Sequence, residues 1–435
     1  MKIIKKALVL TILAVAAFAL SSCSVYDLAY RTSSTANTNE KYMTEDDVNT
    51  LIQGIEENVT VNAGDNINIT INSGGNQNVV SASKGLLSVV SIEANFTVTT
   101  VVPPSFFYEG YTQTTKQTSL GSGVIYQIDK ERGDAYIITN YHVVYSQGAD
   151  TENDISDDIK CYLYGQEYEK YSIKASFIGG SMTYDIAVLK VSSSDVLRES
   201  KAAAAEFTDS NNVSILDTAI AIGNPEGLGI SATVGSVNVE SEYISMRSID
   251  GNGYISVRVL RIDTPVNSGN SGGGLFDDNG RLIGIVNGKI KDSSVDNIAY
   301  AIPSNVAKYV ADNIIYYDSV DPANDSVKRL VLGITPEVKS SGVNYDEETG
   351  KILKYEEVIV GNIKVGSLAE SSFKVNDVIK KVIIDGKEYE ITRTYNVIDI
   401  MLTVRKTSAV VFIIERDGAE LEIAVDVSAI EYTDA

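Results

Sequence analysis

The chain has 435 residues, enough for two or three domains, since one hydrophobic core rarely grows beyond about 250 residues. Hydrophobic residues make up 44% and charged residues 22%, a composition typical of globular protein that excludes intrinsic disorder as the main state. The formal net charge of −22 at pH 7 argues against nucleic acid as a partner, because phosphates require a basic surface.

The first 22 residues have the composition of a secretory signal peptide. Lys2, Lys5 and Lys6 form a positive head, and the 14 residues from Ala7 to Leu20 carry no charge. A helix of that length is too short to cross a bilayer, which needs about 20 residues, but it matches a signal-peptide core. Leu20-Ser21-Ser22-Cys23 then resembles the lipobox of bacterial lipoproteins. The resemblance implies lipid on Cys23 and a lipid-anchored place on the extracytoplasmic side of the cell membrane; the alternative is an ordinary signal peptide with a chance cysteine.

Residues 23–80 are predicted to be a tether with two short elements. Its Ser-, Thr- and Asn-rich start is typical of a flexible linker. Thr44 and Asp47 resemble a capping box for a helix over residues 44–55. Ile67, Ile69 and Ile71 alternate with polar residues, which predicts a short strand.

Cys161 is the only cysteine besides Cys23, so a lipidated Cys23 leaves it without a disulfide partner. It lies in an alternating apolar segment, and we expect it to be a small buried hydrophobic residue.

Residues 81–315 are predicted to form one mainly β domain, because short hydrophobic runs recur between Gly, Asn and Asp turns. Ser304 is the expected N-cap of a helix to about Ile315, and residues 316–328 are the expected linker. Residues 329–428 form a second β-rich unit, with a helix expected from about Asn396 to Arg405. The clearest β runs are Gly123–Ile128, Tyr136–Thr139, Ile186–Val191, Thr218–Ile222 and Leu282–Val286.

Three residues are candidates for nucleophilic catalysis, which needs a nucleophile, a base and an orienting carboxylate. Ser271 lies in the glycine-rich Gly269-Asn270-Ser271-Gly272-Gly273, where the backbone can bend so that several N–H groups converge. His142, the single histidine, follows a hydrophobic strand, and Asp185 begins an apolar one. Each has a plain structural alternative, namely a simple turn, a buried or surface histidine, and a helix or turn cap.

The three candidates occur in the order His142, Asp185, Ser271, the order of a chymotrypsin-type triad. Their surrounding segments resemble the HtrA (DegP-type) family of serine proteases, and the resemblance extends over residues 81–427. It implies a mainly β fold, a chymotrypsin-like double β-barrel followed by a PDZ domain. The matching segments are Gly121–Val124, Thr139–Val144, Asp185–Lys190, Ala221–Pro225, Gly269–Gly273 and Ile298–Pro303.

The resemblance also implies a role for each matching residue. Ser271 would be the nucleophile, His142 the general base and acid, and Asp185 the residue that orients the imidazole. The N–H groups of Gly269 and Ser271 would form the oxyanion hole. Val266 would line the primary specificity pocket, which favours cleavage after small aliphatic residues. The substrate backbone would pair with Ile285, Val286 and Asn287.

Two residues depart from the family pattern. Gly274 replaces a common proline, which could loosen the nucleophile turn, and Tyr141 occupies a position that is often small or polar. Neither change removes a catalytic group.

The C-terminal unit resembles the PDZ domain of the same family. Val331, Leu332, Gly333 and Ile334 match its carboxylate-binding loop, whose successive N–H groups hold a peptide C-terminus. The segment from Gly342 to Glu357 departs from compact PDZ domains. A purely structural β domain is the alternative.

The sequence therefore predicts a membrane-anchored extracytoplasmic serine endopeptidase that degrades or processes misfolded proteins. Expected partners are unfolded polypeptides, peptide C-termini, the membrane through Cys23, and further copies of the chain in a homo-oligomer, by resemblance a trimer. No cofactor or metal is expected: the acidic run from Asp150 to Asp158 lacks the spacing of an EF-hand, and a solvated loop is favoured over calcium binding. The alternative function is a non-proteolytic chaperone or scaffold.

Overall fold

The computed structural model describes residues 59–63, 67–71, 77–102, 109–288, 298–321, 325–347, 350–428 and 432–434. The chain divides into two compact units, residues 1–74 and 75–435. In the first, β1 (Val59–Ala63) pairs with β2 (Ile67–Ile71), and β2 is the predicted strand. The predicted signal peptide, Cys23 and the predicted helix over residues 44–55 lie outside the described residues. None of the described helices has the length and apolar character that a membrane span requires.

Six strands of the second unit close into a first barrel, in the order β3-β4-β5-β8-β7-β6. Their inward side chains form an apolar core that includes Ile92, Ile137 and Leu189, each at most 1% exposed. The predicted runs 123–128, 136–139 and 186–191 all lie in this barrel. Its strands are β3 (Val89–Val102), β4 (Tyr111–Asp129), β5 (Asp134–Thr139), β6 (Asp158–Leu163), β7 (Ile173–Ser181) and β8 (Ile186–Val191).

A second barrel closes in the order β10-β11-β14-β13-β12-β9. Buried residues of both barrels, such as Val188 of the first and Ile222 and Phe276 of the second, share one hydrophobic cluster. The prediction of a mainly β double barrel is thus confirmed. The strands are β9 (Thr218–Gly223), β10 (Ser231–Arg247), β11 (Tyr254–Ile262), β12 (Gly274–Phe276), β13 (Leu282–Asn287) and β14 (Ala299–Pro303).

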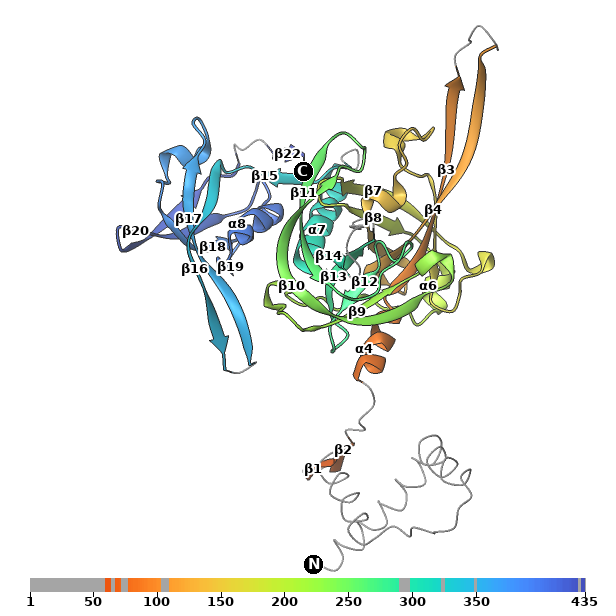
Figure 1. Cartoon of the computed structure of the whole chain (residues 1–435), viewed down its shortest axis with the longest axis horizontal. Coiled ribbons are helices and arrows are strands. Elements are labelled where there is room, and N and C mark those ends of the chain that lie inside the picture. Colours follow the sequence, from red (N-terminus) through yellow and green to blue (C-terminus); the bar gives the residue numbers. More distant parts are fainter. Residues whose placement is uncertain are drawn as a thin grey trace, which may run out of the picture. The chain divides into compact units, whose positions relative to one another are not determined.

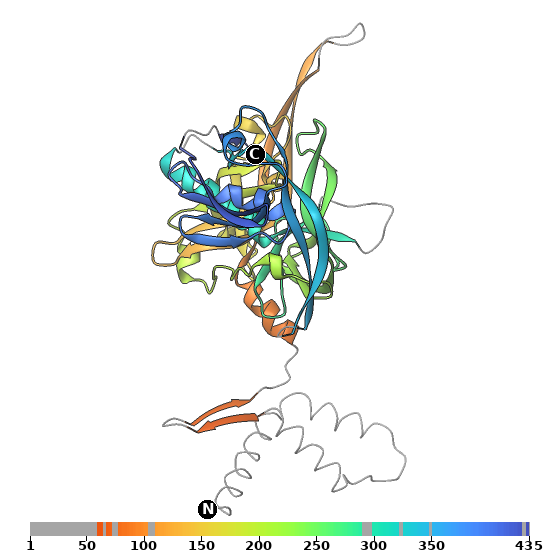
Figure 2. The ribbon, with the colours of Figure 1, turned by 90° about the vertical axis from the view of Figure 1, so that its left-hand side faces the viewer.

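Strands β3 and β4 continue beyond the first barrel as a two-stranded ribbon (Figures 1 and 2). The pairing runs without a break to Val102 and Tyr111, and the outer part of β4 is exposed, in keeping with its Thr- and Gln-rich sequence. The barrel end of the same ribbon is buried. The inner end of the hairpin therefore carries apolar residues that join the core, and its outer end exposes mainly polar residues together with Val101 and Tyr111.

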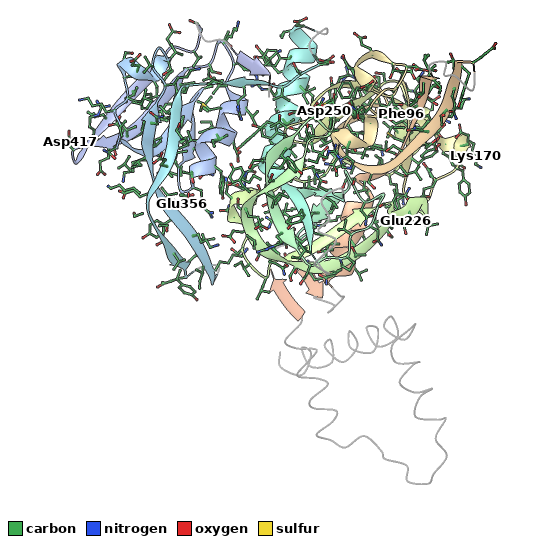
Figure 3. All side chains as sticks on the ribbon, turned by 45° about the horizontal axis from the view of Figure 1, so that its top comes forward. Phe96, Lys170, Glu226, Asp250, Glu356 and Asp417 are labelled. Atoms are coloured by element: carbon green, nitrogen blue, oxygen red, sulfur yellow. The ribbon has the colours of Figure 1, made fainter. Side chains whose placement is uncertain are left out.

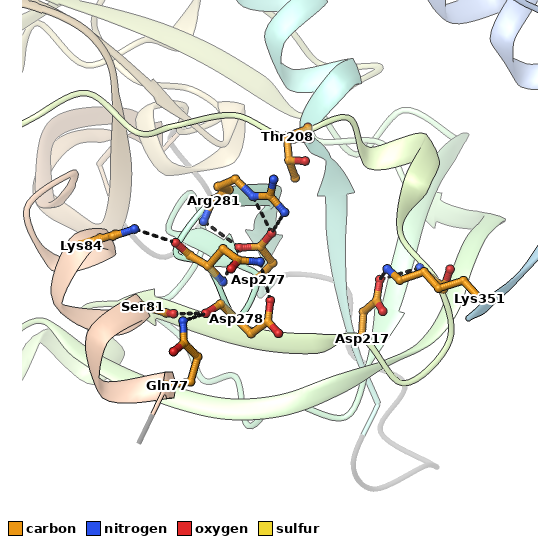
Figure 4. Close-up of polar contacts among 12 residues, drawn as sticks. Gln77, Ser81, Lys84, Thr208, Asp217, Asp277, Asp278, Arg281 and Lys351 are labelled. Atoms are coloured by element: carbon orange, nitrogen blue, oxygen red, sulfur yellow. Dashed lines mark hydrogen bonds and ion pairs between the residues drawn. The ribbon is translucent and has the colours of Figure 1, made fainter. Parts of the chain in front are cut away.

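Helix α4 (Gln77–Leu86) packs on the second barrel and was not predicted from the sequence. Three of its side chains donate to carbonyls of the turn between β12 and β13 (Figure 4). Gln77 and Ser81 both reach the carbonyl of Asp278, and Lys84 reaches that of Asn279 at 3.1 Å. Gly85 allows the helix to pack closely against the barrel, because a Cβ at this position would lie 2.5 Å from the Ile222 side chain of β9.

Helix α7 (Ser304–Val320) begins where predicted but runs further, so residues 316–320 belong to the helix and not to a linker. Pro303 is the N-cap; Ser304 lies in the helix and donates from Oγ to Thr208. The rest of the expected linker is also packed against the barrels where it is described. Val327 is fully buried in the hydrophobic cluster that the two barrels share. The Asn313 side chain accepts a hydrogen bond from the backbone N–H of Lys328 and donates one to its carbonyl.

The C-terminal unit is a sheet in the order β16-β17-β18-β20-β21, with β19 on β18, and a separate pair formed by β15 and β22. Helix α8 (Thr394–Ile400) starts two residues before its predicted position, and a 3-10 helix (Met401–Thr403) extends it. The core of this unit includes Phe412, Val382 and Val404, all fully buried. The strands are β15 (Lys328–Leu330), β16 (Ile334–Asp346), β17 (Lys351–Ile363), β18 (Val378–Ile384), β19 (Lys387–Glu390), β20 (Val410–Arg416), β21 (Ala419–Val425) and β22 (Tyr432–Asp434).

The segment that departs from compact PDZ domains forms the outer half of the β16–β17 hairpin. Lys351 pairs with Asp217 at 2.6 Å (Figure 4), and Lys354 with Glu240 at 2.8 Å, both on the second-barrel side. Glu356, labelled in Figure 3, accepts bonds from Thr394 and Arg393 at the start of α8. The longer hairpin thus makes charged contacts with the barrel as well as with its own unit.

Shorter helices complete the described residues. They are α5 (Tyr141–Val144), α6 (Asp195–Glu199) and the 3-10 turns Glu152–Asp154, Glu169–Tyr171, Ser210–Asn212, Pro225–Gly227 and Leu368–Ser371.

Cys161 is fully buried in β6, and burial raises the pKa of its thiol to about 12. Because the thiolate is the reactive form, we expect a Cys23→Ala protein to show no reactive thiol with a disulfide reagent at about pH 8, and one after denaturation. As a control, Tyr164→Cys, at a position 51% exposed, adds a thiol that reacts in the folded protein. Rapid labelling of Cys161 in the native state would contradict the described packing.

Candidate active site

The Asp185 carboxylate is fully buried between β7 and β8 and receives three hydrogen bonds. The backbone N–H of His142 donates to Oδ1 at 3.1 Å, His142 Nδ1 lies 2.7 Å from Oδ2, and Asn287 Nδ2 donates to Oδ2 at 2.7 Å. The side-chain amide of Asn140 donates a hydrogen bond to the backbone carbonyl of Asp185 at 2.8 Å. A buried charge is costly unless it is hydrogen-bonded, and these donors supply that stabilisation.

His142 lies in the short helix α5, which directly follows β5. Its neighbours Val143 and Val144 are buried, and Tyr141 packs edge-on against Phe177, so the unusual tyrosine is a core residue. A carboxylate only accepts hydrogen bonds, so Nδ1 carries the hydrogen and Nε2 of the imidazole is left as an acceptor. With its side chain 17% exposed, His142 can present Nε2 to a neighbour or a ligand.

Ser271 lies in the loop between β11 and β12, and this loop is attached to both barrels. Ser122 of β4 donates its N–H to the Ser271 carbonyl at 2.8 Å and its Oγ to the Gly269 carbonyl at 2.7 Å. Gly272 donates to Val286 of β13 at 2.9 Å. Gly272 has φ +82, and a Cβ there would lie 2.2 Å from the Ser122 carbonyl, so only glycine fits.

Two consecutive residues connect the serine to the buried carboxylate. Asn287 donates to Asp185, and Gly288 donates its N–H to Ser271 Oγ at 3.1 Å. On the other side, a Cβ at Gly272 would lie 3.0 Å from the Asn140 nitrogen, just before His142. The structure therefore brings the three predicted residues to one place where the barrels meet, with His142 and Asp185 from the first barrel and Ser271 from the second.

The backbone N–H groups of Gly269 and Ser271 have no hydrogen-bond acceptor among the described residues. Both residues are buried at the site, and Gly269 has φ +94, packed against the Asn224 carbonyl. Free backbone donors next to a serine hydroxyl are suited to an oxygen that gains negative charge during a reaction.

The predicted pairing of substrate with Ile285 and Val286 is wrong. β13 lies between β12 and β14, and Ile285 pairs with Gly274 on one side and Ile302 on the other. The backbone N–H of Val286 donates to the Gly273 carbonyl, and the Val286 carbonyl accepts from the N–H of Gly272. No free strand edge remains at these residues. Asn287, predicted in the same group, instead supports Asp185; a polar residue at the end of the apolar run Leu282–Val286 was the available signal for that role.

The two other predicted features lie close to the nucleophile loop. Val266 is half-buried and packs against the core of the second barrel. Gly274 does not loosen the turn, because it is a buried residue of β12 whose Cβ position is filled by the Phe276 ring at 2.4 Å.

We expect Gly272→Ala to lower the free energy of unfolding by about 2 kcal/mol or more, since the left-handed conformation costs an L-residue about 1–2 kcal/mol and the new Cβ meets two backbone groups. Gly165→Ala is the matched control: it has φ +74 but no atom within 4 Å, so only the conformational cost of about 1 kcal/mol applies. Urea unfolding curves measure both, and equal losses would contradict the tight contact at Gly272.

Residues 121–285 match the family model of the trypsin-like peptidase domain. The chain is 34% identical over 281 residues to the serine protease Do-like HtrA of Bacillus subtilis (63% of this chain, 56% of the relative), and 31% identical over 278 residues to that of Lactococcus lactis subsp. lactis (61% and 60%). A solved HtrA-type protease with a decapeptide aligns with TM-score 0.47 and 24% identity over 82% of this chain and 97% of that one. The chain spans little more than half the length of the curated relatives. Residues 121–285, which contain His142, Asp185 and Ser271, are therefore a trypsin-like serine peptidase domain related in sequence to HtrA-type serine proteases.

Proposed function

We propose that the chain is a serine endopeptidase, anchored to the cell membrane on its extracytoplasmic side, that degrades or processes misfolded proteins. One observation carries this proposal: the buried Asp185 contacts His142 and Asn287, and the next residue, Gly288, bonds Ser271 Oγ. A base oriented by a buried carboxylate, at the same site as a serine in a glycine-rich turn, is the arrangement that serine proteases use to hydrolyse peptide bonds. Sequence similarity to HtrA-type serine proteases supports the same function.

In this mechanism Ser271 Oγ attacks the carbonyl carbon of the scissile bond while its proton passes to His142 Nε2. Asp185 stabilises the imidazolium, which then protonates the leaving amine as the tetrahedral intermediate collapses to an acyl-enzyme. A water molecule, deprotonated by His142, hydrolyses the acyl-enzyme and releases Ser271. Asn287 acts as a positioning residue, because it holds the carboxylate that holds the base.

The free N–H groups of Gly269 and Ser271 would bind the oxyanion of the intermediate. A preference for small aliphatic residues before the cleaved bond, based on Val266, stays a prediction. Cleavage-site profiling on an unfolded protein measures it.

The C-terminal unit is proposed to be a PDZ domain that binds peptide C-termini. β16 is the edge strand of its sheet, and α8 contacts the same strand, which leaves an edge to which a peptide strand can add. In the preceding loop, Gly333 has φ +91, and no described residue accepts from the N–H of Leu332 or Gly333. Such free donors are suited to a terminal carboxylate.

We expect Ser271→Ala to remove casein cleavage, since loss of the nucleophile in a serine protease lowers kcat by about 10⁶-fold. The matched control is Ser268→Ala, an exposed serine of the same loop, which should keep activity and fold. A fluorophosphonate probe should label the unaltered protein and the control but not Ser271→Ala. Absence of labelling in the unaltered protein, even with unfolded substrate present, would favour the alternative of a non-proteolytic chaperone or scaffold.

Lipid on Cys23 is proposed as the membrane anchor, because the mature chain is strongly acidic and gains no electrostatic attraction to anionic lipid. We therefore expect Cys23→Ala to move the protein from the membrane fraction to the soluble fraction. Cys161→Ala is the control and should stay in the membrane fraction. Unchanged retention of Cys23→Ala would show that another segment anchors the chain.

A further inference from the structure

A cavity of about 330 Å³ lies between the barrels and the C-terminal unit. Its barrel wall is formed by residues such as Tyr184, Tyr243 and Arg258, and its other wall by Arg329 and one face of α8. The α8 face contributes Tyr395, Ile398 and Asp399. Thr335 and Pro336, near the start of the edge strand β16, also line the cavity, so it lies against both β16 and α8.

Arg258 is held in this wall but keeps one unused donor. It is 6% exposed, its Nη2 donates to Asp399 Oδ2, and the Tyr395 ring stacks on its guanidinium at 4.0 Å. Its Nε is buried and has no hydrogen-bond partner among the described residues. An unpaired buried donor is unfavourable, and a guanidinium is best satisfied by a carboxylate.

The charges that line the cavity are unbalanced toward positive. Arg329 donates to the neutral hydroxyl of Tyr184 at 2.9 Å and forms no ion pair with any described residue. Asp399 is the one carboxylate among the described residues of the wall, and both guanidinium charges act on it. Two arginines therefore face one aspartate, which leaves about one positive charge in a partly open, largely apolar space.

The apolar parts of the wall indicate what else the occupant carries. Ile398 is 36% exposed although it lies on the packed face of α8, and Val257 and Ile302 line the barrel side. A free inorganic anion would leave the exposed Ile398 side chain uncovered. A peptide offers apolar side chains and a carboxylate together, and it can lie along β16 at the same time.

We propose that this cavity is a carboxylate-binding subsite for peptides, in which Arg258 and Arg329 bind an acidic group of a ligand docked between β16 and α8. The inference rests on the peptide-docking part of the proposed function and does not depend on peptide-bond hydrolysis. It makes the peptidase domain part of the recognition surface, because Arg258 belongs to β11 of the second barrel. Selectivity for acidic peptides then depends on a contact with Arg258 that the C-terminal unit, which supplies Arg329, does not have by itself.

The test measures binding of fluorescent ten-residue peptides that end in valine to the full chain carrying Ser271→Ala. Peptides with Glu at each of the last four positions before the valine are compared with their Gln counterparts and with C-terminal amides. We expect at least one Glu peptide to bind about tenfold or more tightly than its Gln match, the range of a charge-assisted hydrogen bond. Arg258→Gln and Arg329→Gln should each reduce this ratio toward one.

Arg393→Gln is the matched control. Arg393 also stacks on Tyr395, at 5.0 Å, but pairs with Glu356 and does not line the cavity, so the ratio should persist. Arg329→Gln breaks no ion pair within the described part of the chain and remains informative if Arg258→Gln fails to fold. If the arginine variants instead remove the preference for free acid over amide, the bound carboxylate is the C-terminal one.

The possible failures are distinguishable. A Glu-to-Gln ratio, and an acid-to-amide ratio, that both arginine variants leave unchanged would overturn the subsite while peptide docking stands. If no peptide binds, the docking proposal itself is wrong and this inference falls with it. Casein cleavage by the unaltered protein, measured separately, is independent of both results.

Discussion

Burial of the Asp185 carboxylate is the constraint on which the candidate site depends. A fully buried charge has to be surrounded by donors, and here they come from both barrels: His142 from the first and Asn287 from the second. Neither barrel could enclose this group alone without leaving it short of a hydrogen bond. The same bonds that stabilise the charge therefore fix the distance between the two halves of the site.

The loop that carries Ser271 is held by backbone contacts in which glycine is required. Ser122 of the first barrel and Val286 of the second both bond to this loop, so its position depends on the packing of both barrels. The dense contacts leave the N–H groups of Gly269 and Ser271 without a described acceptor. A rigid loop with free donors is the condition under which electrostatic stabilisation acts without reorganisation.

Much of the fold could be predicted from the sequence because barrel strands alternate apolar and polar residues between clear turn signals. The three candidate residues were found because each lies in a distinctive local segment. Helix α4 was missed since its fit depends on the distant turn at Asp278, and the packed segment around Val327 has the composition of a linker. The roles of Asn287 and Arg258 depend on partners more than 100 residues away in the chain, Asp185 and Asp399, which local patterns do not reveal.

His142 is the only histidine among the 435 residues, and its imidazole lies against the buried carboxylate. The chain thus contains a natural single-site spectroscopic probe. Imidazole proton resonances in a nuclear magnetic resonance spectrum arise from this one ring, without isotope editing or mutagenesis to assign them. Changes in those resonances when a peptide is added would report on the site directly, even from the far side of the molecule.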